Sequence, residues 1–191
     1  MTARLVIMGP QGSGKGTQAA RLAKHLGVPT ISTGDIFRAN IAGGTALGAL
    51  AQEYTGRGEL VPDEVTNDMV RNRLAEPDAA DGFILDGFPR NAAQVTALDE
   101  ILDGLGVRLD VVVQLTAERG ELLARMRKRA EIEGRADDTE EVIARRLDIY
   151  DAETAPLAAA YAERGLLVSV NGIGDVDEVT ARLLGALSSP V

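Results

Sequence analysis

The most constraining feature of the sequence is a glycine-rich stretch at residues 9–17, "GPQGSGKGT", directly after the apolar run Leu5–Met8. Its spacing is GxxxxGK, and the apolar pattern of Gln18–Leu26 predicts a helix behind it. Glycines let backbone N–H groups turn inward around an anion, while the helix N-terminus and Lys15 add positive charge at the same point. An ordinary strand-to-helix turn is the alternative, but the lysine and both flanking elements favour a phosphate-binding loop.

Short apolar runs alternate with helical patterns along the chain. The runs lack polar alternation and are rich in β-branched residues, as in strands buried on both faces of a parallel sheet. They are Leu5–Met8, Val28–Ser32, Phe83–Leu85, Val111–Leu115 and Leu166–Val170. Helices are expected at Gln18–Leu26, Asp63–Leu74, Ala92–Leu105, Glu118–Ile132, Thr139–Arg164 and Asp175–Leu187. This order predicts an α/β fold, a doubly wound parallel five-stranded sheet flanked by helices, with ligands at the carboxyl ends of the strands.

Two segments interrupt the alternation and are expected to project from the sheet. Residues 34–61 carry helix-like stretches at Ile36–Ile41 and Leu47–Tyr54 but no strand. Residues 130–138 form a polar, glycine-containing break between two arginine-rich helices. Because no repeat, low-complexity tract or linker separates these parts, we expect a single domain.

Composition excludes several classes of protein. The 191 residues include no cysteine, so disulfides and thiolate zinc sites are excluded and we expect no zinc. A net charge of −9 argues against a nucleic-acid binder. No apolar run approaches the ~20 residues of a membrane span, and none near the N-terminus suits a signal peptide, so we expect a cytoplasmic protein without membrane contact. Arginines far outnumber lysines, which suits phosphate binding but also fits a compositional bias of the genome.

A second charged position is expected where the run Phe83–Leu85 ends. An unpaired carboxylate at Asp86 would be costly there, so a cation or metal is its natural partner. Mg²⁺ held through water is one interpretation, and capping of the next helix or pairing with an arginine is the other. Arg90 lies four residues on, close enough to serve the same pocket. In the glycine loop, Gly16 takes the place of the usual hydroxyl residue and Thr17 follows, which weakens direct Mg²⁺ ligation by Thr17.

Further arginines flank the polar break. Arg125 and Arg129 are four residues apart on one predicted helix face, and Arg135 and Arg146 follow across the break. Their spacing alone leaves phosphate binding and a solvated helix face equally open. The single histidine, His25, lies near a helix end and is assigned no chemistry.

Several stretches together resemble the adenylate kinases of the nucleoside monophosphate kinase family. They are "GPQGSGKGTQ", "ISTGDIFR", "GELVPDE", "GFILDGFPR", "GRADDTEEVIARR" and "TAPL", in the family's order and over essentially the whole chain. Gln11 departs from the family's usual loop residues, at a place where only backbone donors are needed. The resemblance implies a P-loop kinase that uses Mg²⁺ with ATP to convert ATP and AMP reversibly into two ADP. We expect a monomer whose partners are these three nucleotides.

The resemblance also implies a division of the single domain and a set of site residues. The core would comprise residues 1–31, 62–127 and 139–191, with a helical NMP-binding segment at 32–61 and a short lid without zinc at 128–138. The residues implied for catalysis are Lys15, Arg90, Arg125, Arg129, Arg135 and Arg146. Those implied for ATP binding are Gly12, Ser13, Gly14, Lys15, Gly16, Thr17, Arg129 and Gly174. Those implied for AMP binding are Thr33, Arg38, Glu59, Leu60, Val61, Gly87, Phe88, Pro89, Arg90, Gln94, Arg135 and Arg146.

Other points carried over from the family concern the metal, the lid and the choice of substrate. Asp86, through water, and Thr17 are the implied Mg²⁺ residues. Asp137 and Asp138 either pair with lid arginines or cap the next helix. A UMP/CMP kinase of the same family is the nearest alternative, although Thr33 in "STGD" is similar to the AMP-selective pattern. A regulator that binds nucleotides without turnover is a second alternative, and the many cationic residues argue against it.

Overall fold

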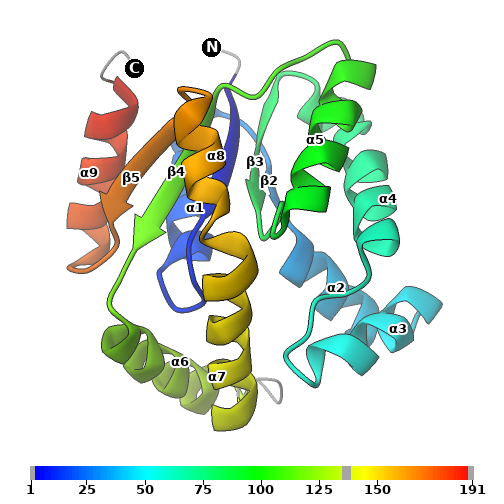
Figure 1. Cartoon of the computed structure of the whole chain (residues 1–191), viewed down its shortest axis with the longest axis vertical. Helices are drawn as coiled ribbons and strands as arrows, with labels where there is room; N and C mark the ends of the chain where they lie inside the picture. Colours follow the sequence, from blue (N-terminus) through cyan, green and yellow to red (C-terminus); the bar gives the residue numbers. More distant parts are fainter. Residues whose placement is uncertain (1–2, 135–138, 189–191) are drawn as a thin grey trace.

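The computed structural model describes residues 3–134 and 139–188, which form an α/β fold around one sheet (Figure 1). The sheet has five strands in the order β2-β3-β1-β4-β5, and every pairing is parallel. The strands are β1 (Ala3–Met8), β2 (Thr30–Ser32), β3 (Gly82–Asp86), β4 (Val111–Thr116) and β5 (Leu167–Asn171). The predicted five-stranded parallel sheet is therefore confirmed.

Helices connect successive strands. The first group is α1 (Lys15–Leu26), α2 (Thr33–Ala42), α3 (Ala46–Thr55), α4 (Asp63–Leu74), the 3₁₀ turn η1 (Pro77–Ala79) and α5 (Ala92–Gly104). The second group is α6 (Arg119–Glu133), α7 (Glu140–Ile149), the π-helical turn η2 (Tyr150–Thr154), α8 (Leu157–Glu163) and α9 (Val176–Ser188). Within the described ranges, no helix is both long and apolar enough to cross a membrane.

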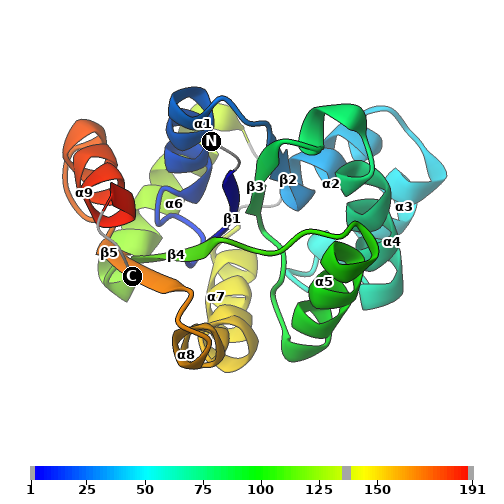
Figure 2. The ribbon, with the colours of Figure 1, turned by 90° about the horizontal axis from the view of Figure 1, so that it is seen from above.

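Helices cover both faces of the sheet. Figure 2 shows α1 and α9 on one side of the strands and α5 and α8 on the other. Neighbouring residues of β1 enter different cores: Leu5 packs with Leu22 and Leu183, whereas Val6 packs with Leu98. Because both faces of the inner strands β1 and β3 are buried, these two strands read as continuous apolar runs instead of alternating ones.

The position of β1 in the middle of the sheet determines where loops meet. From β1 the chain moves to one side for β2 and β3 and then to the other for β4 and β5. Ile7 of β1 is in register with Asp86 of β3, so the loops that follow these two strands leave the sheet side by side. This reversal of strand order at the carboxyl ends is where α/β sheets bind ligands.

The segment of α2 and α3 projects from the sheet, as Figure 1 shows, and has its own small core of Phe37, Ala51 and Val61. The two helices approach so closely that a Cβ on Gly48 would lie 2.1 Å from the backbone oxygen of Asn40. A glycine is required at that contact because any side chain would separate the helices.

Two predicted boundaries differ from the structure. The helix predicted over Thr139–Arg164 is divided into α7, the π-helical turn η2 and α8, because Pro156 lacks the N–H that a continuous helix needs. The break predicted to begin at residue 130 begins later, since α6 continues to Glu133 and ends at Gly134, whose φ is +60°. The predicted lid residues Arg135, Asp137 and Asp138 lie outside the described residues.

Candidate active site

The glycine loop connects β1 to α1 through glycine residues whose φ is positive. Gly12 has φ +83° and Gly14 has φ +92°, and Gly14 precedes the first residue of α1, Lys15. The predicted helix began at Gln18, so the structure extends it by one turn into the loop. Ser13 is buried, and its hydroxyl has no hydrogen-bond partner in the described part of the chain. A loop of this shape at a helix N-terminus is suited to bind an anion.

Lys15 and Asp86 meet at the carboxyl ends of the two adjacent strands. The Nζ of Lys15 lies 3.9 Å from Oδ1 of Asp86, and the two side chains are only 15% and 14% exposed. The interpretation in which Asp86 caps the next helix is wrong, because the side chain of Asn91 caps α5. Asp86 instead pairs with a lysine, which the sequence reasoning did not name as its partner.

Several arginines lie close enough to this ion pair to act on it electrostatically. Burial lowers the pKa of Lys15 and the pKa of Arg90 below their usual values, and Asp86 offsets part of this effect at both. Repulsion from Arg38 lowers both pKa values further. Repulsion from Arg129 also lowers the pKa of Lys15, and repulsion from Arg146 also lowers the pKa of Arg90. A bound polyanion would neutralise this cluster.

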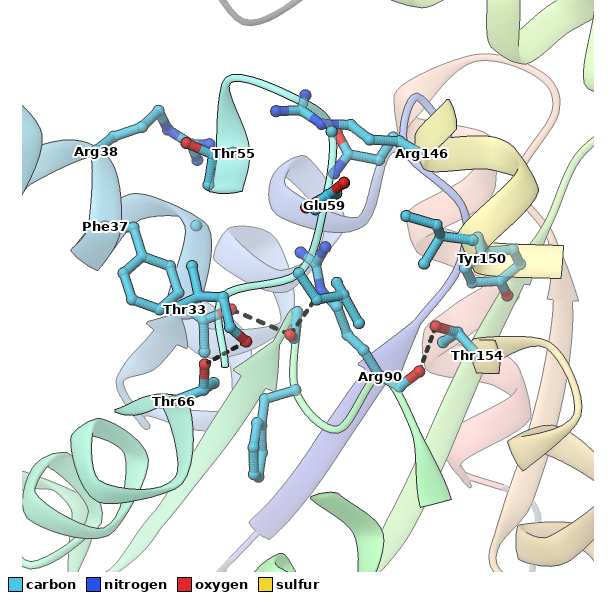
Figure 3. Close-up of a pocket in the computed structure, with 18 of the residues that line it drawn as sticks. Thr33, Phe37, Arg38, Thr55, Glu59, Thr66, Arg90, Arg146, Tyr150 and Thr154 are labelled. Atoms are coloured by element: carbon cyan, nitrogen blue, oxygen red, sulfur yellow. Dashed lines mark hydrogen bonds between the residues drawn. The ribbon is translucent and has the colours of Figure 1, made fainter. Parts of the chain in front are cut away.

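A cavity of about 400 Å³ opens beside the cluster (Figure 3). Lys15 and every described residue of the predicted AMP set line it, namely Thr33, Arg38, Glu59, Leu60, Val61, Gly87, Phe88, Pro89, Arg90, Gln94 and Arg146. The structure thus brings together residues from α2, α5, α7 and the loops after α3 and β3. Arg135 falls outside the described residues.

One backbone carbonyl, that of Gly87, holds two side chains that line the cavity. The oxygen of Gly87 accepts hydrogen bonds from Oγ1 of Thr33 at 3.1 Å and from Nε of Arg90 at 2.8 Å, both drawn in Figure 3. Gly87 has φ +85°, and a Cβ there would lie 2.6 Å from Oγ1 of Thr33. Glycine is therefore needed at this position for both side chains to reach the carbonyl.

The π-helical turn η2 also contacts the cavity wall, which sequence reasoning missed. Oγ1 of Thr154 donates to the backbone oxygen of Arg90 at 2.6 Å (Figure 3). Tyr150 from the same turn lines the cavity, as do Phe37 and Thr66. A signal existed for Thr154, which opens the quoted stretch "TAPL", and π-helical turns are often found at functional sites. Phe37 likewise lies within the stretch "ISTGDIFR", whereas Tyr150 carried no signal because it lies within an ordinary helical pattern.

Apart from Lys15, none of the predicted ATP-side residues lines this cavity. Arg125 and Arg129 are both on α6, and Nη1 of Arg125 donates to the backbone oxygens of Gly12 at 3.3 Å and Gly172 at 3.2 Å. Arg125 thereby joins the glycine loop to the loop after β5, so it is more than a solvated charge on a helix face. Gly174 is exposed in that second loop with φ +123°, and Thr17 is exposed in the first turn of α1.

Glu59 occupies a different place in the wall, between the projecting segment and α7. Its carboxylate lies 2.8 Å from Nη2 of Arg145 and 3.2 Å from Nη2 of Arg57. These pairs are partly exposed, so each contributes roughly 0–1 kcal/mol to stability. They place the side chain of Glu59 next to α7, beside Arg146.

Comparison with known proteins gives a consistent result. The family model described as adenylate kinase matches residues 7–166. The chain belongs to the adenylate kinase family. It is 62% identical over 184 residues to the adenylate kinase of Bifidobacterium longum, covering 96% of this chain and 99% of that protein. It is 58% identical to the adenylate kinase of Kocuria rhizophila, covering 96% of this chain and 98% of that protein.

A third relative, the adenylate kinase of Thermobifida fusca, is 56% identical over 186 residues, with 97% of this chain and 98% of that protein covered. Adenylate kinases are phosphotransferases, so the predicted family and the predicted class of enzyme are confirmed.

Proposed function

We propose that this chain catalyses the reversible transfer of the γ-phosphoryl group of ATP to AMP, giving two ADP. One observation carries the proposal: the largely buried cations Lys15 and Arg90 line the cavity where it adjoins the glycine loop, and burial lowers the pKa of both. The phosphates of ATP and AMP, meeting at this point, would add negative charge beside Lys15 and Arg90 to that of Asp86. ATP would approach from the glycine loop and AMP would occupy the cavity.

On the AMP side, we assign separate surfaces to the phosphate and to the base. Arg38, Arg90 and Arg146 line the cavity near Lys15 and would bind the phosphate, joined by Arg135 of the lid. The other described residues of the predicted AMP set would hold the sugar and base, and they are Thr33, Glu59, Leu60, Val61, Gly87, Phe88, Pro89 and Gln94. Arginine suits the first role because its planar fork matches phosphate oxygens.

On the ATP side, backbone N–H groups of residues 12–17 and the ammonium of Lys15 would bind the phosphates. Arg129 and Arg125 of α6 would neutralise the transferring group. Gly174 would contact the adenine through its backbone. The bond from Arg125 to Gly172 holds the loop of Gly174 next to the glycine loop, which supports this placement.

We propose that Mg²⁺ accompanies ATP. The described residues contain no group of three or more side chains able to hold a metal alone, which fits an ion that is held chiefly by ATP phosphates and water. Asp86 offers a buried carboxylate oxygen beside Lys15 and would hold the ion through water, with Thr17 as a weaker candidate. Bound there, the ion would neutralise developing charge on the phosphates.

The chain's own residues would act by positioning and by charge stabilisation. The acceptor oxygen of a phosphate monoester is largely ionised at neutral pH, since its second pKa is about 6, so no catalytic base is required. Lys15 and the arginines would hold donor and acceptor in line. Closure of segments 32–61 and 128–138 would exclude water, the competing acceptor. We further propose that the enzyme is a cytoplasmic monomer.

The test is an acceptor assay in which ADP formation from ATP is followed with AMP, CMP and UMP in turn. We expect kcat/KM for AMP to exceed the values for both pyrimidine nucleotides by at least about 10²-fold, because base-reading groups left unpaired are costly. A preference for CMP or UMP would assign the chain to the pyrimidine kinases. Tight ATP binding without turnover on any acceptor would indicate a regulator.

A further inference from the structure

The side-chain amide of Gln94 is held at both ends by partners whose chemistry differs. Gln94 lies in the first turn of α5, is 2% exposed and lines the cavity. Its Nε2 donates to Oδ1 of Asp63 at 2.9 Å, and its Oε1 accepts from the backbone N–H of Arg90 at 2.7 Å. Asp63 is the first residue of α4, so the amide connects α4 to the loop after β3.

These two partners fix the direction in which the amide points. A carboxylate can only accept hydrogen bonds and a backbone N–H can only donate. Rotating the Gln94 amide by about 180° would place oxygen against oxygen at Asp63 and N–H against N–H at Arg90, which would leave buried polar groups unpaired. Asp63 therefore selects one of two otherwise similar amide orientations.

Asp63 is itself held in place by the residue that caps α5. Nδ2 of Asn91 donates to the same Oδ1 of Asp63 at 3.0 Å, while Oδ1 of Asn91 accepts from the backbone N–H of Gln94 at 2.9 Å. The three side chains form a closed set of hydrogen bonds between the N-termini of α4 and α5. The orientation of Gln94 is thus built into the fold.

The fixed amide retains one N–H and one oxygen lone pair for a ligand, in a fixed order. The Watson–Crick edge of adenine presents the matching pair, an acceptor at N1 and a donor at the 6-amino group. Hypoxanthine, the base of IMP, presents the reverse, a donor at N1 and an acceptor at O6. We propose that Asp63 is a positioning residue that makes the acceptor site select 6-aminopurine over 6-oxopurine nucleotides by fixing the Gln94 amide. This inference rests on the proposed function, in which the cavity holds the acceptor base.

A purely structural role for Asp63 makes a different prediction. A carboxylate in the first turn of α4 stabilises that helix through its negative charge, whatever nucleotide is bound. Loss of that charge would affect AMP and IMP equally. Asp63→Asn separates the two roles, because it keeps an acceptor oxygen for Gln94 and removes the charge.

The experiment measures kcat and KM with AMP and with IMP for the parent, Asp63→Ala, Asp63→Asn and Asp68→Ala. Asp68 is the matched control, an exposed carboxylate on the same helix that pairs with Arg71. Asp63→Ala should raise KM for AMP and lower the AMP-to-IMP ratio of kcat/KM, each about tenfold, with KM for ATP unchanged. Asp63→Asn should retain the ratio to within about threefold, and Asp68→Ala should match the parent. Thermal unfolding of each variant verifies that it is folded.

Repeating the Asp63→Ala measurement in a Gln94→Ala variant tests whether Asp63 acts through Gln94. In Gln94→Ala, where no amide remains to be oriented, Asp63→Ala should leave the AMP-to-IMP ratio unchanged. The inference is overturned if Asp63→Ala leaves the ratio at the parent value, if Asp63→Asn lowers it as much as Asp63→Ala does, or if Asp63→Ala still lowers it in Gln94→Ala. Failure of the proposed function would look different, because the parent itself would then produce no ADP from ATP and AMP.

Discussion

The two ends of the cavity differ in how their polar groups are held. At the phosphate end, Lys15 and Arg90 are largely buried and nearby arginines repel them. At the base end, polar groups form hydrogen bonds with one another. Thr33 donates to Gly87, and Gln94 bonds to Asp63 and the backbone of Arg90. At the phosphate end, the burial of two cations lowers the stability of the protein without ligand and favours the binding of a polyanion. At the base end, the polar side chains already have hydrogen-bond partners, so they favour a ligand with one arrangement of donors and acceptors. We infer that rate comes chiefly from the phosphate end and base selectivity from the base end.

The largest expected effect comes from removing the cation at the phosphate end. Lys15→Met should lower kcat by about 10³-fold, because a charge that stabilises the transferring group is lost. The folded-state pKa of Lys15 is lowered by burial, so its charged form opposes folding at neutral pH, and the variant should unfold at a temperature no lower than the parent. A coupled ADP assay and a thermal melt measure both. A kcat within threefold of the parent would contradict the assigned role.

A smaller effect is expected at the junction of the two ends. Thr154→Val keeps the shape of the side chain but leaves the backbone oxygen of Arg90 without its donor at 2.6 Å. We expect kcat/KM for AMP to fall about tenfold as Arg90 shifts. Thr154→Ser retains the hydroxyl and is the matched control. Equal losses in the two variants would show that the hydroxyl is not what positions Arg90.

At the base end, truncation should change selectivity more than rate. Thr33→Ala removes the donor to Gly87 and opens space beside the expected base, so KM for AMP should rise about fivefold. KM for ATP should stay within error of the parent value. Steady-state kinetics with each nucleotide varied in turn make the comparison. If KM for ATP rises as much as KM for AMP, the assignment of Thr33 to the AMP base end of the cavity is wrong.

The smallest effect is expected at Tyr161, which does not line the cavity. It measures how much an unpaired buried hydroxyl lowers the free energy of unfolding. The hydroxyl of Tyr161 has no hydrogen-bond partner among the described residues, and burial raises its pKa to about 12. Tyr161→Phe should therefore raise the free energy of unfolding by about 1 kcal/mol and leave kcat unchanged. Chemical denaturation and the ADP assay measure the two quantities.

The same tyrosine predicts a pH dependence. Its pKa is about 12 in the folded protein and about 10 when unfolded, so the unfolded state loses the proton first. This contribution to stability is constant below about pH 10 and declines as the pH rises toward 12. The gain from Tyr161→Phe should therefore increase over that range. A stability difference that is flat with pH would place the hydroxyl in water.

Much of this architecture could be predicted because it depends on local patterns. The buried strands appear as apolar runs, and the glycine loop is recognisable from the spacing that ends at Lys15. The π-helical turn could not be predicted from periodicity, since one extra residue per turn barely disturbs a helical pattern, although Pro156 marks its end. The bond between Asp63 and Gln94 joins side chains 31 positions apart, and only the packing of α4 against α5 brings them together.

The central claim is that one cluster of cations receives the phosphates of two nucleotides at once. Calorimetric titration with a bisubstrate dinucleotide, two adenosines joined by a polyphosphate chain, tests it most directly. We predict one dinucleotide bound per chain, displacement of both ATP and AMP, and loss of most of the affinity in Lys15→Met and in Arg90→Met. Binding of two dinucleotides per chain, or displacement of ATP alone, would contradict the account.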